Sequence, residues 1–192
     1  IATASILDKS KPGDNILAPS PSYPLFDYLG RLNDVEVVPY PLGYEPGWHI
    51  DRDGLRARLG PESRAILVVH PNNPTGSFVR REELTFLIER CRTRSLALVA
   101  DEVFADYAFT TDVDRVVSHA GTDEVLTFTL SGLAKISALP QMKLAWIVVS
   151  GLDAILQDAL ARLEVIADTY LSVSAPVANA LPRLLDVRRT LQ

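Results

Sequence analysis

Short apolar runs alternate with amphipathic segments along most of the chain. The runs are rich in β-branched residues, and several of them, such as AILVVH, LALVAD and AWIVVS, are apolar up to their last residue instead of alternating. A strand that is buried on both faces has this composition, whereas a strand with one wet face alternates between apolar and polar residues. The pattern predicts a mainly parallel sheet with strands over residues 15–19, 35–40, 65–70, 96–101, 125–130 and 144–150.

The segments between these runs have the periodicity of helices. In one of them Leu84, Leu87, Ile88 and Cys91 recur at the spacing of a single buried helix face, and most charged side chains are left for water. Because strands alternate with helices, we expect an α/β fold in three layers, with helices on both faces of the sheet. The predicted helices cover residues 23–32, 51–59, 80–92 and 153–170.

The chain shows no internal repeat, low-complexity tract or interdomain linker. We therefore expect one domain over residues 1–192. Ile1 falls where a helix is already under way, and Gln192 follows another helical segment, so both ends look cut.

Composition and charge restrict the class of protein. The 192 residues are 47% hydrophobic and 22% charged, which suits an ordinary globular chain with one substantial core. Its 19 Lys and Arg against 24 Asp and Glu give a net charge of −5, which argues against nucleic acid or an anionic membrane as the main partner. No apolar run approaches the roughly 20 residues of a membrane helix, and the first residues lack the order of a signal peptide. A cytoplasmic protein is the expectation.

Polar residues follow three of the apolar runs directly. Residues 70–76 read HPNNPTG, Asp101 and Glu102 follow LALVA, and residues 131–135 read SGLAK. Ligands collect at the carboxyl ends of strands in open parallel sheets, so all three segments could face one crevice. Each has an ordinary explanation when taken singly, as a turn, a helix cap or a surface lysine. Their joint occurrence, in order and at strand ends, favours a functional site.

Four segments, PSPSYPLF, HPNNPTG, VADEVFADY and SGLAKISALPQMKLAW, resemble the large domain of class I/II (fold type I) pyridoxal-phosphate aminotransferases in order and spacing. The resemblance covers roughly residues 12–180. It implies pyridoxal 5'-phosphate as cofactor, an amino acid and a 2-oxo acid as substrates, and a homodimer. It also implies a fragment that lacks the N-terminal segment and the C-terminal small domain, or else a shortened relative.

The resemblance assigns catalytic roles to two residues. Lys135 matches the lysine that forms the Schiff base with the cofactor and then moves the proton of the substrate Cα. Asp101 matches the aspartate that pairs with the pyridine nitrogen and keeps the ring protonated, so that the ring withdraws electrons.

Four further residues match positions that bind the cofactor. Asn73 matches the asparagine that donates to the phenolate oxygen, and Tyr23 lies where the family places a ring stacked on the pyridine. Ser131 and Lys143 match the phosphate-binding positions, although the family commonly has arginine at the latter, and lysine loses the two-pronged grip of a guanidinium.

A second departure from the family is Phe104, which stands where a tyrosine usually donates a second hydrogen bond to the phenolate. Asn73 would then act alone unless Tyr107 reaches in. The arginine that binds the substrate carboxylate is not identifiable, and Arg188 and Arg189 receive no assignment. His70 is expected to be structural, because the three histidines show no metal-ligand spacing.

Other functions remain compatible with these residues. A β-lyase acting on sulfur amino acids or a cyclopropane-forming synthase would use the same lysine, aspartate and asparagine, because the cofactor performs the electron chemistry. A non-catalytic domain that senses cofactor or amino acid is the alternative of a different class. No helix-turn-helix or nucleotide-binding glycine motif is present in the sequence.

Overall fold

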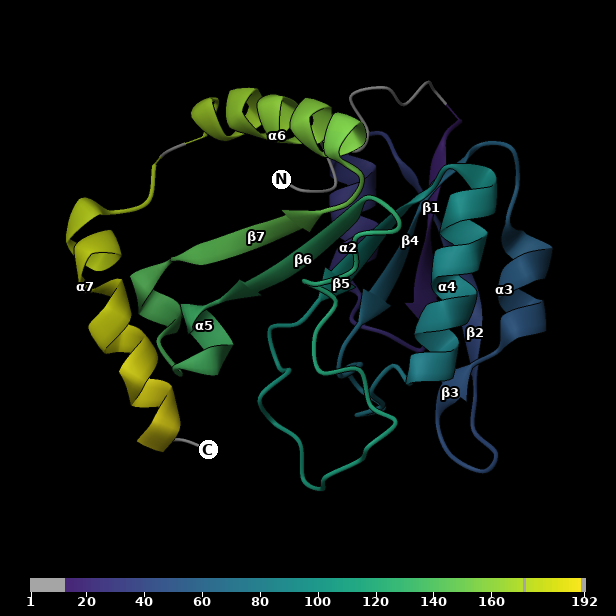
Figure 1. Ribbon diagram of the computed structural model, residues 1–192, viewed down its shortest axis with the longest axis horizontal. Coiled ribbons are helices and arrows are strands. Elements are labelled where there is room, and N and C mark those ends of the chain that lie inside the picture. Colours follow the sequence, from purple (N-terminus) through teal and green to yellow (C-terminus); the bar gives the residue numbers. More distant parts are fainter. Residues whose placement is uncertain (1–12, 171, 191–192) are drawn as a thin grey trace.

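The computed structural model describes residues 13–170 and 172–190 (Figure 1). The predicted helix at Ile1 lies outside these residues. The strands are β1 (Asn15–Ser20), β2 (Glu36–Gly43), β3 (His49–Ile50), β4 (Ser63–Val69), β5 (Ala97–Asp101), β6 (Thr127–Gly132) and β7 (Ala145–Ser150). The helices are α2 (Leu25–Leu32), α3 (Arg52–Arg58), α4 (Arg81–Arg94), α5 (Leu133–Ile136), α6 (Asp153–Asp168) and α7 (Ala175–Asp186), with 3-10 turns η1 (Pro140–Met142) and η2 (Val187–Thr190).

The seven strands form one sheet in the order β3-β2-β1-β4-β5-β6-β7. Neighbouring strands from β2 to β6 are parallel. The predicted mainly parallel α/β fold is therefore confirmed, and all six predicted strands are present, with ends that differ by at most three residues.

Both outer strands run against their neighbours. β7 is antiparallel to β6, because the connection after β6 folds as α5 and η1 without crossing to the other end of the sheet. β3 is antiparallel to β2 and was missed by the sequence analysis, since a strand of two residues has no detectable alternation.

The four predicted helices correspond to α2, α3, α4 and α6. The helix predicted from residue 23 begins at Leu25, directly after its N-cap Pro24, whose backbone is already helical. α7 is the helical segment expected before Gln192. None of the described helices is long and apolar enough to cross a membrane.

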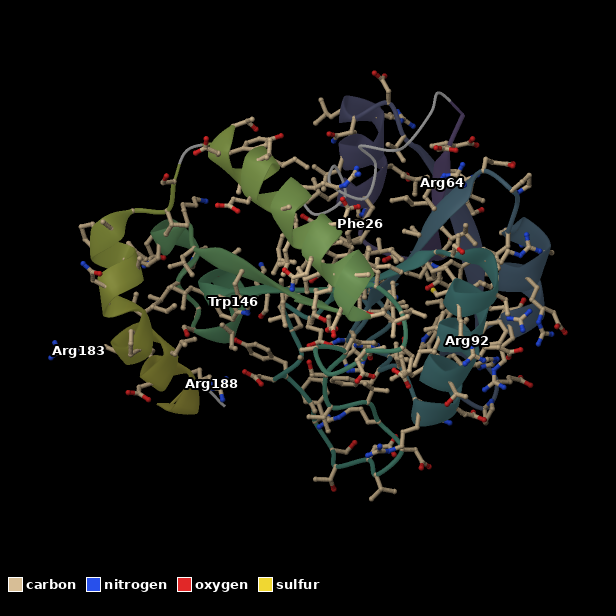
Figure 2. The ribbon with its side chains drawn as sticks, turned by 45° about the horizontal axis from the view of Figure 1, so that its top comes forward. Phe26, Arg64, Arg92, Trp146, Arg183 and Arg188 are labelled. Atoms are coloured by element: carbon tan, nitrogen blue, oxygen red, sulfur yellow. The ribbon has the colours of Figure 1, made fainter. Side chains whose placement is uncertain are left out.

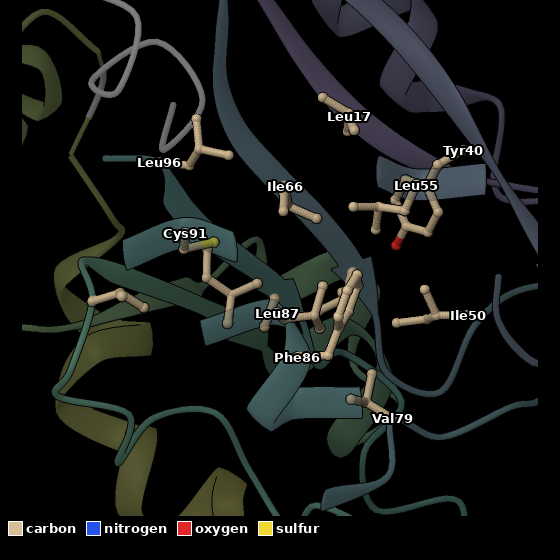
Figure 3. Close-up of a cluster of buried hydrophobic side chains, with 14 of the residues drawn as sticks. Leu17, Tyr40, Ile50, Leu55, Ile66, Val79, Phe86, Leu87, Cys91 and Leu96 are labelled. Atoms are coloured by element: carbon tan, nitrogen blue, oxygen red, sulfur yellow. The ribbon is translucent and has the colours of Figure 1, made fainter. Parts of the chain in front are cut away.

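The sheet has a hydrophobic core on each face. On one face, Leu17 and Ile66 of the sheet belong to one buried cluster with Leu55 of α3 and Leu87 and Cys91 of α4 (Figure 3). On the other face, a second cluster includes Ala159 of α6 and is packed against by Phe26 of α2. The predicted three layers are thus present. Cys91 is fully buried, and burial raises the pKa of its thiol to about 12, which makes it a packing residue.

Candidate functional site

Four neighbouring strand ends carry most of the predicted site residues. β1, β4, β5 and β6 are parallel neighbours, so their carboxyl ends lie along one edge of the sheet. Tyr23 follows β1, Asn73 follows β4, Asp101 ends β5, and Lys135 lies in α5 directly after β6. The structure therefore brings these four segments to a common edge, and it leaves Tyr23, Asn73 and Lys135 exposed there.

Asn72 joins the turns that follow β1 and β4. Its Oδ1 accepts from Ser22 Oγ at 3.0 Å, and its Nδ2 donates to the carbonyl of Pro21 at 3.0 Å and to Thr75 Oγ1 at 2.9 Å. Asn72 is 5% exposed, whereas the side chain of Asn73 forms no hydrogen bond within the described part of the chain. The sequence analysis missed Asn72, for which the doubled asparagine in the turn was the available signal.

Asp101 is a half-buried carboxylate at the end of β5. Burial raises its pKa, with a smaller contribution from the charge of Glu102, and a hydrogen bond from the backbone N–H of Val103 at 3.1 Å opposes this rise. Among the described residues none forms an ion pair with Asp101. A cationic group beside this carboxylate would therefore stabilise its ionised form.

Glu102, the next residue, has a different role. Its Oε1 accepts from the backbone N and Nδ1 of His119 at 2.6 and 2.7 Å, and its Oε2 accepts from Ser118 Oγ at 2.7 Å. Burial alone would raise the pKa of Glu102, but these hydrogen bonds outweigh it, and the pKa is lowered. Glu102 is thus a buried carboxylate that anchors the segment before β6.

His70 connects the start of the HPNNPTG turn to two other segments. Its backbone N donates to the carbonyl of Asp101 at 2.8 Å, its Nδ1 accepts from the N–H of Val79 at 3.0 Å, and its Nε2 donates to the carbonyl of Val116 at 2.9 Å. These contacts fit the predicted structural role. In the described residues no group of three His, Cys, Asp or Glu side chains could hold a metal ion.

Lys135 is linked to the loop that follows Asp101. Its Nζ lies 5.3 Å from the centre of the Phe104 ring, and its carbonyl accepts a hydrogen bond from Tyr107 Oη at 2.7 Å. The two rings meet edge to face, with centres 5.8 Å apart. Because the Tyr107 hydroxyl donates to this carbonyl, it is not available here as the second donor that the sequence analysis considered.

Ser131 and Lys143 lie on the strands and turn around α5. Ser131 is half-buried and pairs with Trp146, which Figure 2 shows on β7. The N–H of Leu133 donates to the carbonyl of Leu144 at 3.0 Å, which places Lys143 beside the start of α5. Lys143 is exposed, and its φ of 52° is in the left-handed region.

The C-terminal turn η2 also reaches this region. Arg188 lies beyond α7 (Figure 2), and its Nη1 is 3.7 Å from Oδ2 of Asp106, which is in the loop between Phe104 and Tyr107. The sequence analysis gave Arg188 no role. Here it forms an ion pair that joins the end of α7 to the loop after β5.

Comparisons with known proteins agree with this arrangement. Residues 1–189 match the protein family described as "Aminotransferase class I and II". Tyrosine aminotransferase from Dictyostelium discoideum is 29% identical over 180 residues, which cover 93% of this chain and 43% of that enzyme. Glutamate-pyruvate aminotransferase AlaA from Escherichia coli (strain K12) is 29% identical over 173 residues, which cover 90% of this chain and 42% of that enzyme.

Solved structures show the same fold. An aminotransferase from Escherichia coli has a TM-score of 0.82 at 26% identity and matches 100% of this chain and 46% of its own length. Alanine aminotransferase from Pyrococcus furiosus has a TM-score of 0.85 at 23% identity and matches 99% of this chain and 50% of its own length. The chain thus spans at most about half the length of these relatives. The resemblance seen in the four sequence motifs is confirmed, and the chain belongs to the class I and II aminotransferase family.

Proposed function

We propose that the protein is a pyridoxal-phosphate-dependent aminotransferase that moves an amino group between an amino acid and a 2-oxo acid. One observation carries the proposal: the carboxyl ends of three adjacent strands present an amide, a carboxylate and an amine, Asn73, Asp101 and Lys135, in segments that resemble those of the family. When bound, the cofactor supplies a conjugated ring that accepts the electrons left at the substrate Cα.

Asp101 fits the cofactor's ring nitrogen. A half-buried carboxylate with a raised pKa is stabilised by a positive charge beside it, and in return it keeps a proton on that nitrogen. Its Oδ1 is already held by the N–H of Val103, so the carboxylate has a fixed direction before anything binds.

The other proposed binding residues match the remaining parts of the cofactor. The exposed amide of Asn73 would donate to the phenolate oxygen, and the exposed ring of Tyr23 would stack on the pyridine face. The Ser131 hydroxyl and the Lys143 ammonium suit a phosphate dianion, with lysine acting as a point charge where a guanidinium would bind through two nitrogens.

Lys135 has two tasks in this proposal. Its Nζ would hold the cofactor, and as a free amine the same atom would carry a proton between the substrate Cα and the cofactor. A lysine in α5, one short step from the end of β6, lies at the same sheet edge as Asp101.

The decisive experiment is borohydride reduction of the purified protein with pyridoxal phosphate, followed by peptide mass spectrometry. The chain has four lysines, Lys9, Lys11, Lys135 and Lys143, so the modified position is easily assigned. We expect the adduct on Lys135, and we expect Lys135→Arg to lose it. A colourless protein without an adduct on Lys135 would instead support the non-catalytic sensor domain.

Two related reactions are separated by their products. Amino transfer requires a 2-oxo acid as acceptor, whereas a β-lyase releases pyruvate and ammonia from a cysteine conjugate without one. A cyclopropane-forming synthase would use neither route. We expect acceptor-dependent transfer, and release of ammonia in the absence of acceptor would favour the β-lyase.

We also propose a homodimer. The family resemblance supports it, and large apolar side chains lie at the surface, among them Leu32 of α2 and the fully exposed Phe109. Sedimentation equilibrium would test this, and a monomer at micromolar concentration would contradict it.

A further inference from the structure

Tyr107 and Lys135 are joined across 28 residues of sequence. The hydroxyl of Tyr107 donates to the main-chain carbonyl of Lys135 at 2.7 Å, and the N–H of Ala138 donates to the same carbonyl at 3.1 Å. This carbonyl oxygen therefore accepts hydrogen bonds from its own segment and one from a distant loop.

The bond from the distant loop matters because α5 is very short. A helix of four residues has too few internal hydrogen bonds to fix its own position, so outside contacts must fix it. At its start, the N–H of Leu133 donates to the carbonyl of Leu144, and Leu133 and Ile136 are buried. At its end, the outside hydrogen bond is the one from Tyr107.

Phe104 adds a second contact with Lys135. Its ring centre lies 5.3 Å from the lysine Nζ, which is within the range of a cation–π interaction, and its ring meets that of Tyr107 edge to face. The two aromatic residues are held in one turn, in which the N–H of Tyr107 donates to the carbonyl of Phe104 at 2.9 Å. This turn begins three residues after Asp101.

We propose that Tyr107 is a positioning residue for Lys135: its hydroxyl fixes the end of α5, and the Phe104 ring beside it supports the lysine side chain. The amine is thereby held in a fixed relation to the loop that starts at Asp101. The inference rests on the proposed function, in which Lys135 bonds the cofactor.

The test is Tyr107→Phe in the purified protein, because it removes one hydroxyl and keeps the ring beside Phe104. Tyr28→Phe is the matched control, since Tyr28 lies exposed on α2 and its hydroxyl forms no hydrogen bond within the described residues. Two quantities are measured: hydrogen exchange of residues 133–139 without cofactor, and the affinity for pyridoxal phosphate from an absorbance titration.

We expect Tyr107→Phe to speed hydrogen exchange in residues 133–139 and to weaken cofactor binding about two- to tenfold, the effect of one lost hydrogen bond. Tyr28→Phe should change neither quantity. Phe104→Leu, which keeps the hydroxyl bond, should weaken binding and leave the exchange of residues 133–139 near that of the wild type.

The outcomes separate the two proposals. A wild-type protein without an adduct on Lys135 refutes the proposed function, while the exchange measurement still tests whether Tyr107 holds α5. If the wild type forms the adduct and Tyr107→Phe changes neither exchange nor affinity, the positioning role is wrong. Faster exchange spread over the whole sheet, with unchanged affinity, would mark a purely structural residue and would also overturn the proposal.

Discussion

We predict that His70 makes the folded protein sensitive to mild acid. The imidazole is fully buried, and burial lowers its pKa from 6.5 to about 4, helped by the neighbouring His119 and opposed by the charge of Glu102. The hydrogen bond to the carbonyl of Val116 also opposes the shift, and Arg115 adds to it. The Nδ1 lone pair accepts from the N–H of Val79, so a proton on that atom would face another donor. The ring is neutral in the native state for this reason.

The sign and size of the effect follow from this shift. Between pH 6.5 and about 4 the unfolded chain binds a proton at His70 and the native protein does not, so stability falls as the pH falls through this range. Each unit of pKa is worth about 1.4 kcal/mol, so the full shift corresponds to roughly 3 kcal/mol, of which about 2 kcal/mol is lost between pH 6.5 and 5.

Two carboxylates act in the same region of pH and must be separated from this effect. The lowered pKa of Glu102 contributes stability that is lost only as the pH falls below its ordinary value of 4.5. The raised pKa of Asp101 acts in the opposite direction, because burial makes its native form take up a proton before the unfolded form does. Both carboxylates are present in the wild type and in a His70 variant, so the difference between their two pH slopes reports the contribution of His70.

The assay is urea unfolding of the wild type and His70→Asn at several values between pH 7 and pH 5. Asparagine can still accept from the N–H of Val79 but cannot be protonated in this range. Between pH 7 and pH 5 the free energy of unfolding of His70→Asn should therefore fall by about 2 kcal/mol less than that of the wild type. His49→Asn, at the start of β3, is the control for the replacement of a histidine by asparagine. Equal slopes for His70→Asn and the wild type would refute the reasoning, whatever the stability of the variant at pH 7.

Three further substitutions test individual contacts. Asp101→Asn should raise the melting temperature of the cofactor-free protein, because it removes a half-buried charge and keeps an acceptor oxygen; a lower melting temperature would contradict this reasoning. The same substitution should abolish amino transfer. Gly132→Ala should lower the free energy of unfolding in urea by about 1–3 kcal/mol, since a Cβ there would lie 2.9 Å from Ala145 Cα. Gly121→Ala should be nearly neutral, because a Cβ there would have nothing within 4 Å. Phe104→Tyr should lower the pH midpoint of the bound cofactor's visible absorbance, and an unchanged or higher midpoint would exclude a phenolate donor at this position.

The layers of the fold could be predicted because the apolar composition of the central strands indicates that both of their faces are buried. Runs such as residues 65–70 and 96–101 are apolar up to their last residue, and they form central strands whose side chains enter both cores. Strand direction is not encoded in this way, so the antiparallel course of β7 could not be read from its composition. It depends on how α5 and η1 fold, and these short elements depend on contacts with other segments.

The segments that form the candidate site could be predicted, but the hydrogen bonds that hold these segments in place could not. The positions of Lys135 and Asp101 after apolar runs indicated the sheet edge on which they lie. The bonds of Asn72 to the turn after β1 and of Tyr107 to Lys135 join residues that are 28 to 51 positions apart. No local pattern reports such pairings, because each partner alone is an ordinary polar residue in a turn.

Two pairs of adjacent residues at the sheet edge each combine a structural residue with a proposed binding residue. In each pair one side chain is buried and bonded within the fold: Asn72 to the turn after β1, and Glu102 to His119. The other member, Asn73 or Asp101, is more exposed and is proposed to face the cofactor. Because the two members share a backbone, the buried side chain fixes where the proposed binding group can lie. A residue that never contacts the cofactor can in this way be as necessary for its binding as one that does.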